Sequence, residues 1–153
     1  MVKFEDMKDL ASSWLEEFAA AINASKAYAR SAKKWGVDFD GAIVLTLQPC
    51  GEVEEEFSLF LDLQAGQCLG AQLLGPGEEP PRPPTVRISG PMATWKKVVF
   101  KEVDVTAALM NKMLELEGDM ALVMRYAQAS IDLVNSTEQT DRTLFTQYDL
   151  GDS

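Results

Sequence analysis

The first part of the chain has the apolar spacing of an amphipathic helix. From Phe4 to about Trp35, apolar residues recur every three or four positions and therefore share one helix face. Ser12 or Ser13 is the expected N-cap, with Glu16 completing a capping box. Asn23 and Ser25 weaken the middle of this helical pattern, which therefore predicts one long helix or two short ones. The apolar face consists of Met7, Leu10, Ala11, Trp14, Leu15, Phe18 and Ile22.

A change from helical spacing to strict alternation marks the next part of the chain. Alternating apolar and polar residues predict strands at Ala42–Gln48, Phe57–Gln64 and Cys68–Leu74. In the second of these, Phe57, Leu59, Leu61 and Leu63 occupy one side. Because the connections between the strands are short, we expect them to form an antiparallel meander.

A proline-rich segment then separates the two halves of the sequence. Residues 75–84 contain five prolines, which can neither join a sheet ladder nor continue a helix. Such a segment could be a ligand for an aromatic groove, but a stiff crossover is favoured because another strand follows directly. The crossover would carry the chain to the other edge of the sheet.

The second half predicts a strand, two helices, a fifth strand and a final helix. Asp104 and Asp119 are the expected N-caps of the second helix and of the final helix, which we expect to run to about Val134. The predicted ranges are a strand at Thr85–Ser89, a helix at Met92–Phe100, a helix from Val105 to about Asn111 and a strand at Leu114–Glu117.

The length of 153 residues fits one domain that buries its own core without disulfides or metals. We expect a single domain over residues 1–153, with its core between about 12 and 135, a polar tail at 136–153 and a mobile end to that tail at 146–153. The sequence has neither a signal-peptide pattern nor an apolar stretch of about 18 residues. A cytoplasmic protein without integral membrane association is the expectation.

Charge and residue usage exclude several classes of function. A net charge of −10 argues against binding nucleic acids or anionic membranes. The chain has no histidine, which removes the commonest general base and the commonest transition-metal ligand. Cys50 and Cys68 could pair only if neighbouring strands bring them together. No calcium-loop, phosphate-loop or dinucleotide motif occurs, so we expect neither a metal nor a cofactor.

Clustered carboxylates do not change this picture. One acidic cluster lies at residues 52–56, before a predicted strand, and Glu115 and Glu117 share the solvent side of another strand. Acid–base catalysis requires carboxyl groups in unlike environments, and both groups here are expected to face water. We therefore predict that the protein is not an enzyme.

Methionines gather in the second half of the chain. Five of the seven fall within residues 85–134, namely Met92, Met110, Met113, Met120 and Met124. Methionine suits a surface that must fit several apolar shapes, although it also fills gaps in an ordinary core. Trp95 has the same ambiguity, since its ring could anchor a helix to the sheet or contact a ligand.

The order of these elements and a set of short segments resemble the sterol carrier protein type-two family of small lipid-binding domains. The resemblance covers most of Ser12–Asn135, and it departs from the family where Asn111-Lys112 replace a glycine and in the long proline-rich loop. The segments that carry it are Ala29–Trp35 before the strand Ala42–Leu47, Ile88-Ser89-Gly90, Thr94-Trp95-Lys96, Ala107–Lys112, Met113–Glu117, and Gly118-Asp119 before Met120–Met124.

The resemblance implies an α+β fold with a curved, mostly antiparallel five-stranded sheet covered by helices. Between the layers it implies an apolar tunnel for a fatty acid, an acyl chain or a sterol-like molecule. Such a protein would bind or transfer lipid without catalysis. The candidate wall residues are Leu45, Phe57, Leu59, Leu61, Val86, Ile88, Trp95, Val99, Leu109, Met110, Met113, Met120 and Met124.

An alternative of a different class remains open at this point. The same fold could have a filled core and act as a protein-interaction or regulatory module. An exposed apolar patch near Trp95 or the final helix would then bind a partner or a second copy of the chain, giving a homodimer. A cofactor-free enzyme is the least favoured alternative, because the acid–base residues that it would need are missing.

Overall fold

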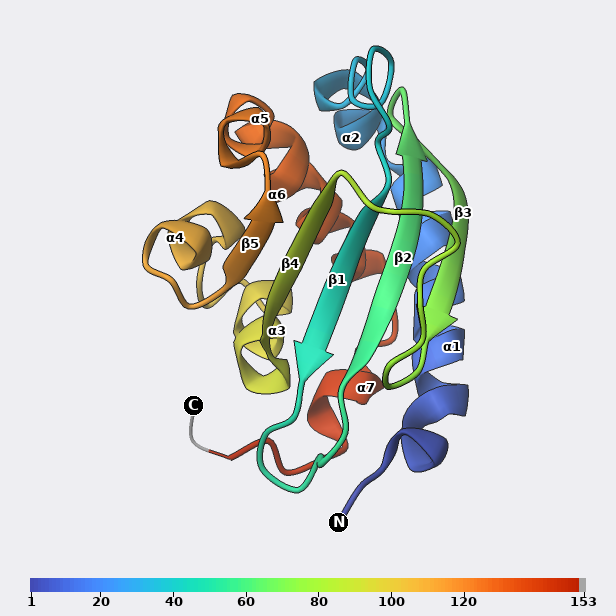
Figure 1. The fold of residues 1–153 in the computed structure, drawn as a ribbon, viewed down its shortest axis with the longest axis vertical. Coiled ribbons are helices and arrows are strands. Elements are labelled where there is room, and N and C mark those ends of the chain that lie inside the picture. Colours follow the sequence, from blue (N-terminus) through green and yellow to red (C-terminus); the bar gives the residue numbers. More distant parts are fainter. Residues whose placement is uncertain (152–153) are drawn as a thin grey trace.

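An open five-stranded sheet with helices on one face forms the protein, as the computed structural model of the chain shows (Figure 1). The structure describes residues 1–151. The strands lie in the order β3-β2-β1-β4-β5, so the last two extend the sheet beyond β1. Their bounds are Ile43–Gln48 (β1), Phe57–Gln64 (β2), Gln67–Leu74 (β3), Val86–Pro91 (β4) and Glu115–Gly118 (β5).

The sheet is mixed and mostly antiparallel, as predicted. The pairs β1–β2, β2–β3 and β4–β5 are antiparallel, which confirms the meander expected for the first three strands. Only β1 and β4 run parallel within the described sheet, in a register that pairs Ile43 with Val86 and Leu45 with Ile88. Parallel neighbours need a long connection, and the chain supplies it through β2, β3 and the proline-rich segment.

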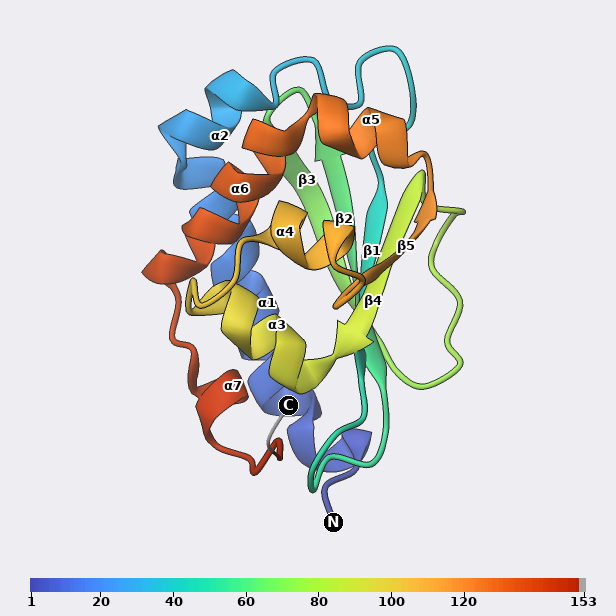
Figure 2. The ribbon, with the colours of Figure 1, turned by 90° about the vertical axis from the view of Figure 1, so that its left-hand side faces the viewer.

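The helices pack against one face of the sheet and form a second layer (Figure 2). The long helix α1 lies along β3, and α6 crosses the same face nearer the centre of the sheet. The helices are Phe4–Ala24 (α1), Lys26–Ser31 (α2), Met92–Val99 (α3), Val105–Met110 (α4), Met120–Arg125 (α5), Ala127–Asn135 (α6), the 3₁₀ turn Ser136–Gln139 and Thr143–Thr146 (α7).

The N-terminal helix is interrupted at Ser25, where polar residues weaken the helical pattern. It begins at Phe4, which is earlier than the N-cap expected at Ser12 or Ser13. Ser25 separates α1 from α2, and its hydroxyl accepts a hydrogen bond from the Tyr28 N–H. The start lies at Phe4, where the Asp6 carboxylate accepts from the Lys3 N–H at 2.9 Å. Ser12 and Ser13 are therefore exposed positions within the helix, because Asp6 and Glu55 accept hydrogen bonds from the N–H groups of Lys3 and Phe4 at its actual start.

The C-terminal part differs from the prediction in two ways. The predicted final helix is divided into α5 and α6 at Tyr126, without a glycine or proline to mark the break. The predicted polar tail buries Leu144 and Phe145 in the core, and Leu150, within the end predicted to be mobile, is buried as well. Two isolated apolar residues in a polar stretch have no periodicity that would predict a helix. The end of that tail, residues 152–153, lies outside the described part of the chain.

The proline-rich segment covers part of the outer face of the sheet, where it passes in front of β2 and β1 (Figure 1). Arg82 holds it there, because its guanidinium donates to Asp40 at 2.7 Å and to Asp62 at 2.9 Å. The same guanidinium lies 5.4 Å from the centre of the Phe60 ring. The pairing holds the pKa of the Asp40 carboxyl below its usual range. The stiff crossover predicted here thus also shields an apolar patch that contains Phe60 and Val44.

Gly41, just before β1, is packed against backbone and gives a sharp test of this fold. A Cβ at Gly41 would lie 2.1 Å from the Leu63 carbonyl oxygen, whereas a Cβ at Gly70 would meet nothing within 4 Å. We expect Gly41→Ala to lower the free energy of unfolding by about 2–3 kcal/mol, because the backbone around it must move. Urea denaturation measures this change.

Gly70→Ala is the matched control, and it should be neutral or raise stability by about 0.5 kcal/mol, since alanine is favoured over glycine in a strand. Equal effects of the two substitutions would contradict the close packing of residue 41 against β2.

An apolar cavity between sheet and helices

A cavity lies between the helical layer and the inner face of the sheet. About 80 Å³ of it is open to the centres of water-sized molecules, several times the roughly 10–15 Å³ that one water needs. The floor comes from alternate residues of three strands, because successive side chains of a strand point to opposite faces. These floor residues are Ile43, Leu45 and Leu47 of β1, Leu59 and Leu63 of β2, and Val86 and Ile88 of β4.

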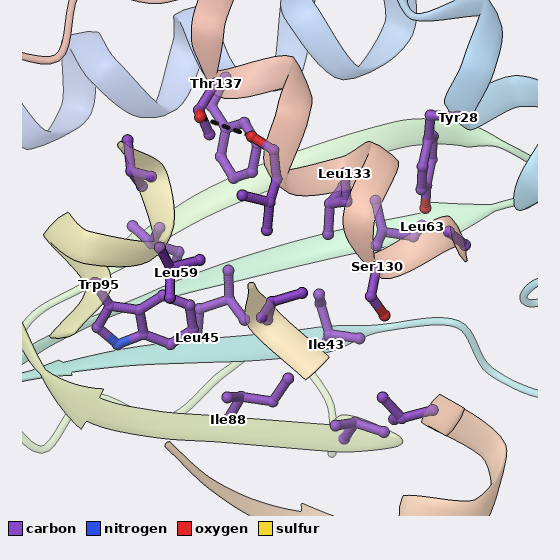
Figure 3. Close-up of a pocket in the computed structure, with 18 of the residues that line it drawn as sticks. Tyr28, Ile43, Leu45, Leu59, Leu63, Ile88, Trp95, Ser130, Leu133 and Thr137 are labelled. Atoms are coloured by element: carbon purple, nitrogen blue, oxygen red, sulfur yellow. Dashed lines mark hydrogen bonds between the residues drawn. The ribbon is translucent and has the colours of Figure 1, made fainter. Parts of the chain in front are cut away.

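Helices supply the remaining walls, and each contributes the apolar face that its spacing creates. In Figure 3, Leu133 and Ser130 of α6 lie across the cavity from Ile43, and Trp95 of α3 lies at the other end. The helical and loop residues that line the cavity are Trp14, Phe18, Tyr28, Trp35, Trp95, Val98, Val99, Val105, Leu109, Val123, Tyr126, Ala129, Ser130, Leu133, Val134, Thr137 and Phe145.

All three tryptophans of the protein line the cavity, and each turns its indole N–H to a protein acceptor. The Trp95 Nε1 donates to the Thr46 carbonyl oxygen at 2.9 Å, and the Trp35 Nε1 donates to the Gly41 carbonyl oxygen at 2.9 Å. The Trp14 Nε1 donates to the Thr140 hydroxyl at 3.0 Å. These bonds fix the orientation of the rings and leave their apolar faces for the cavity.

Few polar groups face the cavity, and they differ in how well they are bonded. The Thr137 hydroxyl donates to the Val134 carbonyl oxygen at 2.7 Å. The Ser130 hydroxyl makes only a long bond of 3.4 Å to the Tyr126 carbonyl oxygen. Tyr28 is 2% exposed and lines the cavity, and every fully buried side-chain nitrogen or oxygen within residues 1–151 has a hydrogen-bond partner. Burial raises the pKa of Tyr28, so the phenol keeps its proton at physiological pH.

The cavity is also free of charge as far as the structure describes its lining. Lysine, arginine, aspartate and glutamate are absent from its walls in residues 1–151. The described chain likewise contains no group of three or more Cys, Asp or Glu side chains that could hold a metal ion. Cys50 and Cys68 are free thiols, and burial raises the pKa of Cys68. This environment favours an apolar ligand, because an ion that entered it would lose its hydration without gaining a charged partner.

Seven of the thirteen predicted wall residues line the cavity. These are Leu45, Leu59, Val86, Ile88, Trp95, Val99 and Leu109. Phe57 and Leu61 are buried in the core beside it without reaching it. Met113 and Met124 are partly buried at its periphery, while Met110 is 69% exposed and Met120 is 37% exposed. These four methionines are not part of the cavity lining, to which α4 and α5 contribute Leu109 and Val123 instead.

Sequence reasoning missed the contribution of the N-terminal helices. Trp14 and Phe18 belong to the predicted apolar face of the first helix, and that face could have placed them over the sheet. Tyr28 and Trp35 had no such signal, because their positions depend on how α2 packs against α6. Phe145 was missed together with the folded C-terminal segment.

The fold and the cavity together define a class of protein: a small α+β domain with an apolar pocket between one sheet and its helices. The sequence profile described as the SCP-2 sterol transfer family matches residues 5–130. The chain therefore belongs to that family, as its resemblance indicated. No curated protein sequence matches it significantly.

Solved structures agree with this assignment. A crystal structure of sterol carrier protein 2 is 28% identical, with a TM-score of 0.73 over 84% of this chain and 95% of that one. A conserved hypothetical protein from Thermus thermophilus, solved in solution, is also 28% identical, with a TM-score of 0.72 over 84% of this chain and 87% of that one. Sterol carrier protein 2 from Yarrowia lipolytica in its apo form is 16% identical, with a TM-score of 0.53 over 80% and 88%, and it shows the fold alone.

The three tryptophans give a direct optical test of access to the cavity. We expect 1-bromododecane to quench part of the tryptophan fluorescence, because its bromine atom inside the cavity would contact at least one of the three rings that line it. Dodecane is the control and should not quench, and iodide in solution should quench little, since Trp14, Trp35 and Trp95 are at most 7% exposed. Quenching by iodide that equals quenching by 1-bromododecane would contradict this burial.

Proposed function

We propose that this protein binds lipid in the apolar cavity and carries it without chemical change. The observation that supports this proposal most directly is the composition of the cavity, whose described walls are apolar and uncharged. A core filled by its own side chains would favour the alternative, an interaction module. The free space between α6 and the sheet instead favours a ligand.

Shape-tolerant walls are sufficient to hold such a ligand. Each methylene transferred from water to an apolar site gains about 0.8 kcal/mol, so a long hydrocarbon chain needs few polar contacts. Aliphatic and aromatic side chains from strands β1, β2 and β4 would contact the chain along its length. Membership in the SCP-2 sterol transfer family supports the same kind of ligand.

A carrier role also fits the chemistry that the residues can perform. The chain lacks histidine, and the carboxylates of its acidic clusters lie on exposed loops and strands. Within residues 1–151, no helix is both long and apolar enough to cross a membrane. A cytoplasmic location and homodimer formation stay predictions, as does the identity of the lipid.

Ala129 offers a way to fill the cavity from inside. It lies on α6, is 6% exposed and lines the cavity. Ala129→Phe should weaken the binding of the neutral dye N-phenyl-1-naphthylamine about tenfold, because each displaced methylene-sized contact costs roughly fourfold in affinity. Fluorescence titration measures the loss.

Ala20→Phe on the exposed side of α1 is the matched control and should bind the dye as the original protein does. Thermal unfolding must show that both variants are folded, and Ala129→Leu replaces the larger substitution if it is not tolerated. Two results would contradict the proposed function. One is unchanged dye binding by a folded Ala129 variant. The other is a purified protein that binds no dye and shows no lipid in native mass spectra.

A further inference from the structure

One edge of the sheet is open to a further strand, whereas the opposite edge is protected. In Figure 1, β3 lies at the border of the described sheet and has no strand beyond it. The other edge strand, β5, has four residues, and its Glu115 and Glu117 are charged. Short, charged edge strands resist further pairing. β3 has eight residues, none of which is charged, so its edge lacks this protection.

The alternation of the β2–β3 ladder shows which backbone groups of β3 point to the open edge. Hydrogen-bonded and non-bonded pairs alternate along an antiparallel ladder. A bonded pair, Gln64 and Gln67, closes the two-residue turn between the strands, so the even-numbered residues of β2 bond to β3. Ala71 and Leu73 lie opposite odd-numbered residues of β2. Their N–H and C=O groups therefore point away from β2.

The protein itself occupies another position on this edge. The Asn23 side chain of α1 accepts from the Cys68 N–H at 2.8 Å and donates to the Cys68 carbonyl oxygen at 2.9 Å. These are the two kinds of bond that the backbone of an added strand would make. Further along β3, Ala71 is exposed and Leu73 is half-buried. The same type of bonding is therefore accessible at these two residues.

A groove between α1 and β3 runs beside the accessible edge. About 360 Å³ of it is open to the centres of water-sized molecules. A residue of an added strand opposite Ala71 or Leu73 would direct its side chain to their face of the sheet, and so into the groove. The groove shares no lining residue with the cavity described above. Its lining consists of Ser12, Leu15, Glu16, Ala19, Ala71 and Leu73.

The spacing of strands and helices excludes a second copy of the chain as the occupant. Helix α1 makes its main contact with the sheet through β3. In a symmetric antiparallel pair of β3 strands, the two strands would lie about 4.8 Å apart, with both α1 helices on the same face. Packed helices need roughly 8–10 Å between their axes, so the two helices would collide. The groove thus fits an extended segment that has no helix of its own above it.

Charge identifies the side chain that suits the groove. Leu15, Ala19 and Leu73 supply apolar walls, and the Glu16 carboxylate is on an exposed residue beside them. None of the ion pairs within residues 1–151 involves Glu16. A lysine or arginine can lay its stem along apolar surface while its charged end meets a carboxylate. The net charge of −10 also attracts a cationic segment.

We propose that the β3 edge and this groove bind an extended segment of another protein that carries a lysine or arginine. The segment adds a strand to the sheet through the backbone of Ala71 and Leu73, and its basic side chain lies in the groove beside Glu16. Because the groove is separate from the cavity, this inference does not depend on the proposed function.

Peptides selected from a phage-displayed library of random sequences of about ten residues test the proposal. The selected peptides should carry a lysine or arginine among β-branched residues, and fluorescence anisotropy of the synthetic peptides measures their affinity. Glu16→Gln should weaken binding about two- to fivefold, the range for an exposed ion pair. Glu102→Gln removes an exposed carboxylate outside the groove and is the matched control, which should bind the peptides unchanged.

The backbone bonds are tested from both sides. Ala71→Pro removes an N–H that points to the open edge and keeps the bonds between β2 and β3, so it should weaken binding about three- to tenfold. N-methylation of the peptide tests the same bonds without altering the protein, should that variant not fold. Methyl groups on one alternate set of peptide amides should abolish binding, and those on the other set should not, because only every second N–H faces β3.

Three results would overturn the proposal. The first is a library that yields no binding peptide. The second is a set of selected peptides that bind folded Glu16→Gln and Ala71→Pro as tightly as the original protein. The third is an equal effect of the two N-methylated sets, which strand addition does not allow.

Discussion

The parallel pairing of β1 with β4 is the constraint on which the rest of the structure depends. It joins the N-terminal meander to the second half of the chain and brings Ile43 and Leu45 beside Val86 and Ile88. These four side chains form the centre of the cavity floor. Parallel neighbours cannot be connected by a tight turn, so the chain must leave β1, build β2 and β3, and return across the sheet. The proline-rich segment makes that return, and Arg82 fixes its position.

The cavity exists because its walls cannot collapse into it at low cost. Protein interiors are normally close-packed, and an empty apolar space forfeits dispersion contacts along its lining. Here the large rings at both ends are held by hydrogen bonds from their indole N–H groups, so filling the space would break bonds at Thr46, Gly41 or Thr140. An apolar ligand that fills the space would restore the missing dispersion contacts, and their free energy would then contribute to its binding.

Strand periodicity predicted the floor of the cavity better than helix periodicity predicted its walls. Successive side chains of a strand point to opposite faces of the sheet, so the alternation identifies the inner face directly. The residues that line the cavity from this face include Leu45, Leu59, Val86 and Ile88. A six-residue helix has no such restriction, and the methionines of α4 and α5 are not part of the cavity lining, to which these helices contribute Leu109 and Val123.

Tyr28 could not be identified from sequence for a different reason. Its burial results from the packing of α2 against α6, and a tyrosine in a helix near lysines has no pattern that distinguishes it from a surface residue. The folded segment at 136–151 also depends on tertiary contacts, among them the bond from the Asp141 N–H to Glu17 at 2.7 Å. Local patterns thus determine the elements, while the complete lining of the cavity forms only when distant elements meet.

The same packing indicates which of the helices α1 and α5 yields more easily to a ligand longer than the free space. Helix α1 buries seven residues, and Asn23 ties its end to β3 through both sides of its amide, with bonds of 2.9 and 2.8 Å to the Cys68 backbone. Helix α5 buries only Val123 and packs chiefly against α6. Since segments with few buried contacts open at a lower free energy, α5 costs less to displace than α1. Met120 and Met124 lie on this helix, and their flexible side chains can repack when it moves. Met120 and Met124, predicted as wall residues, therefore lie outside the cavity lining and on a helix that moves more easily than α1.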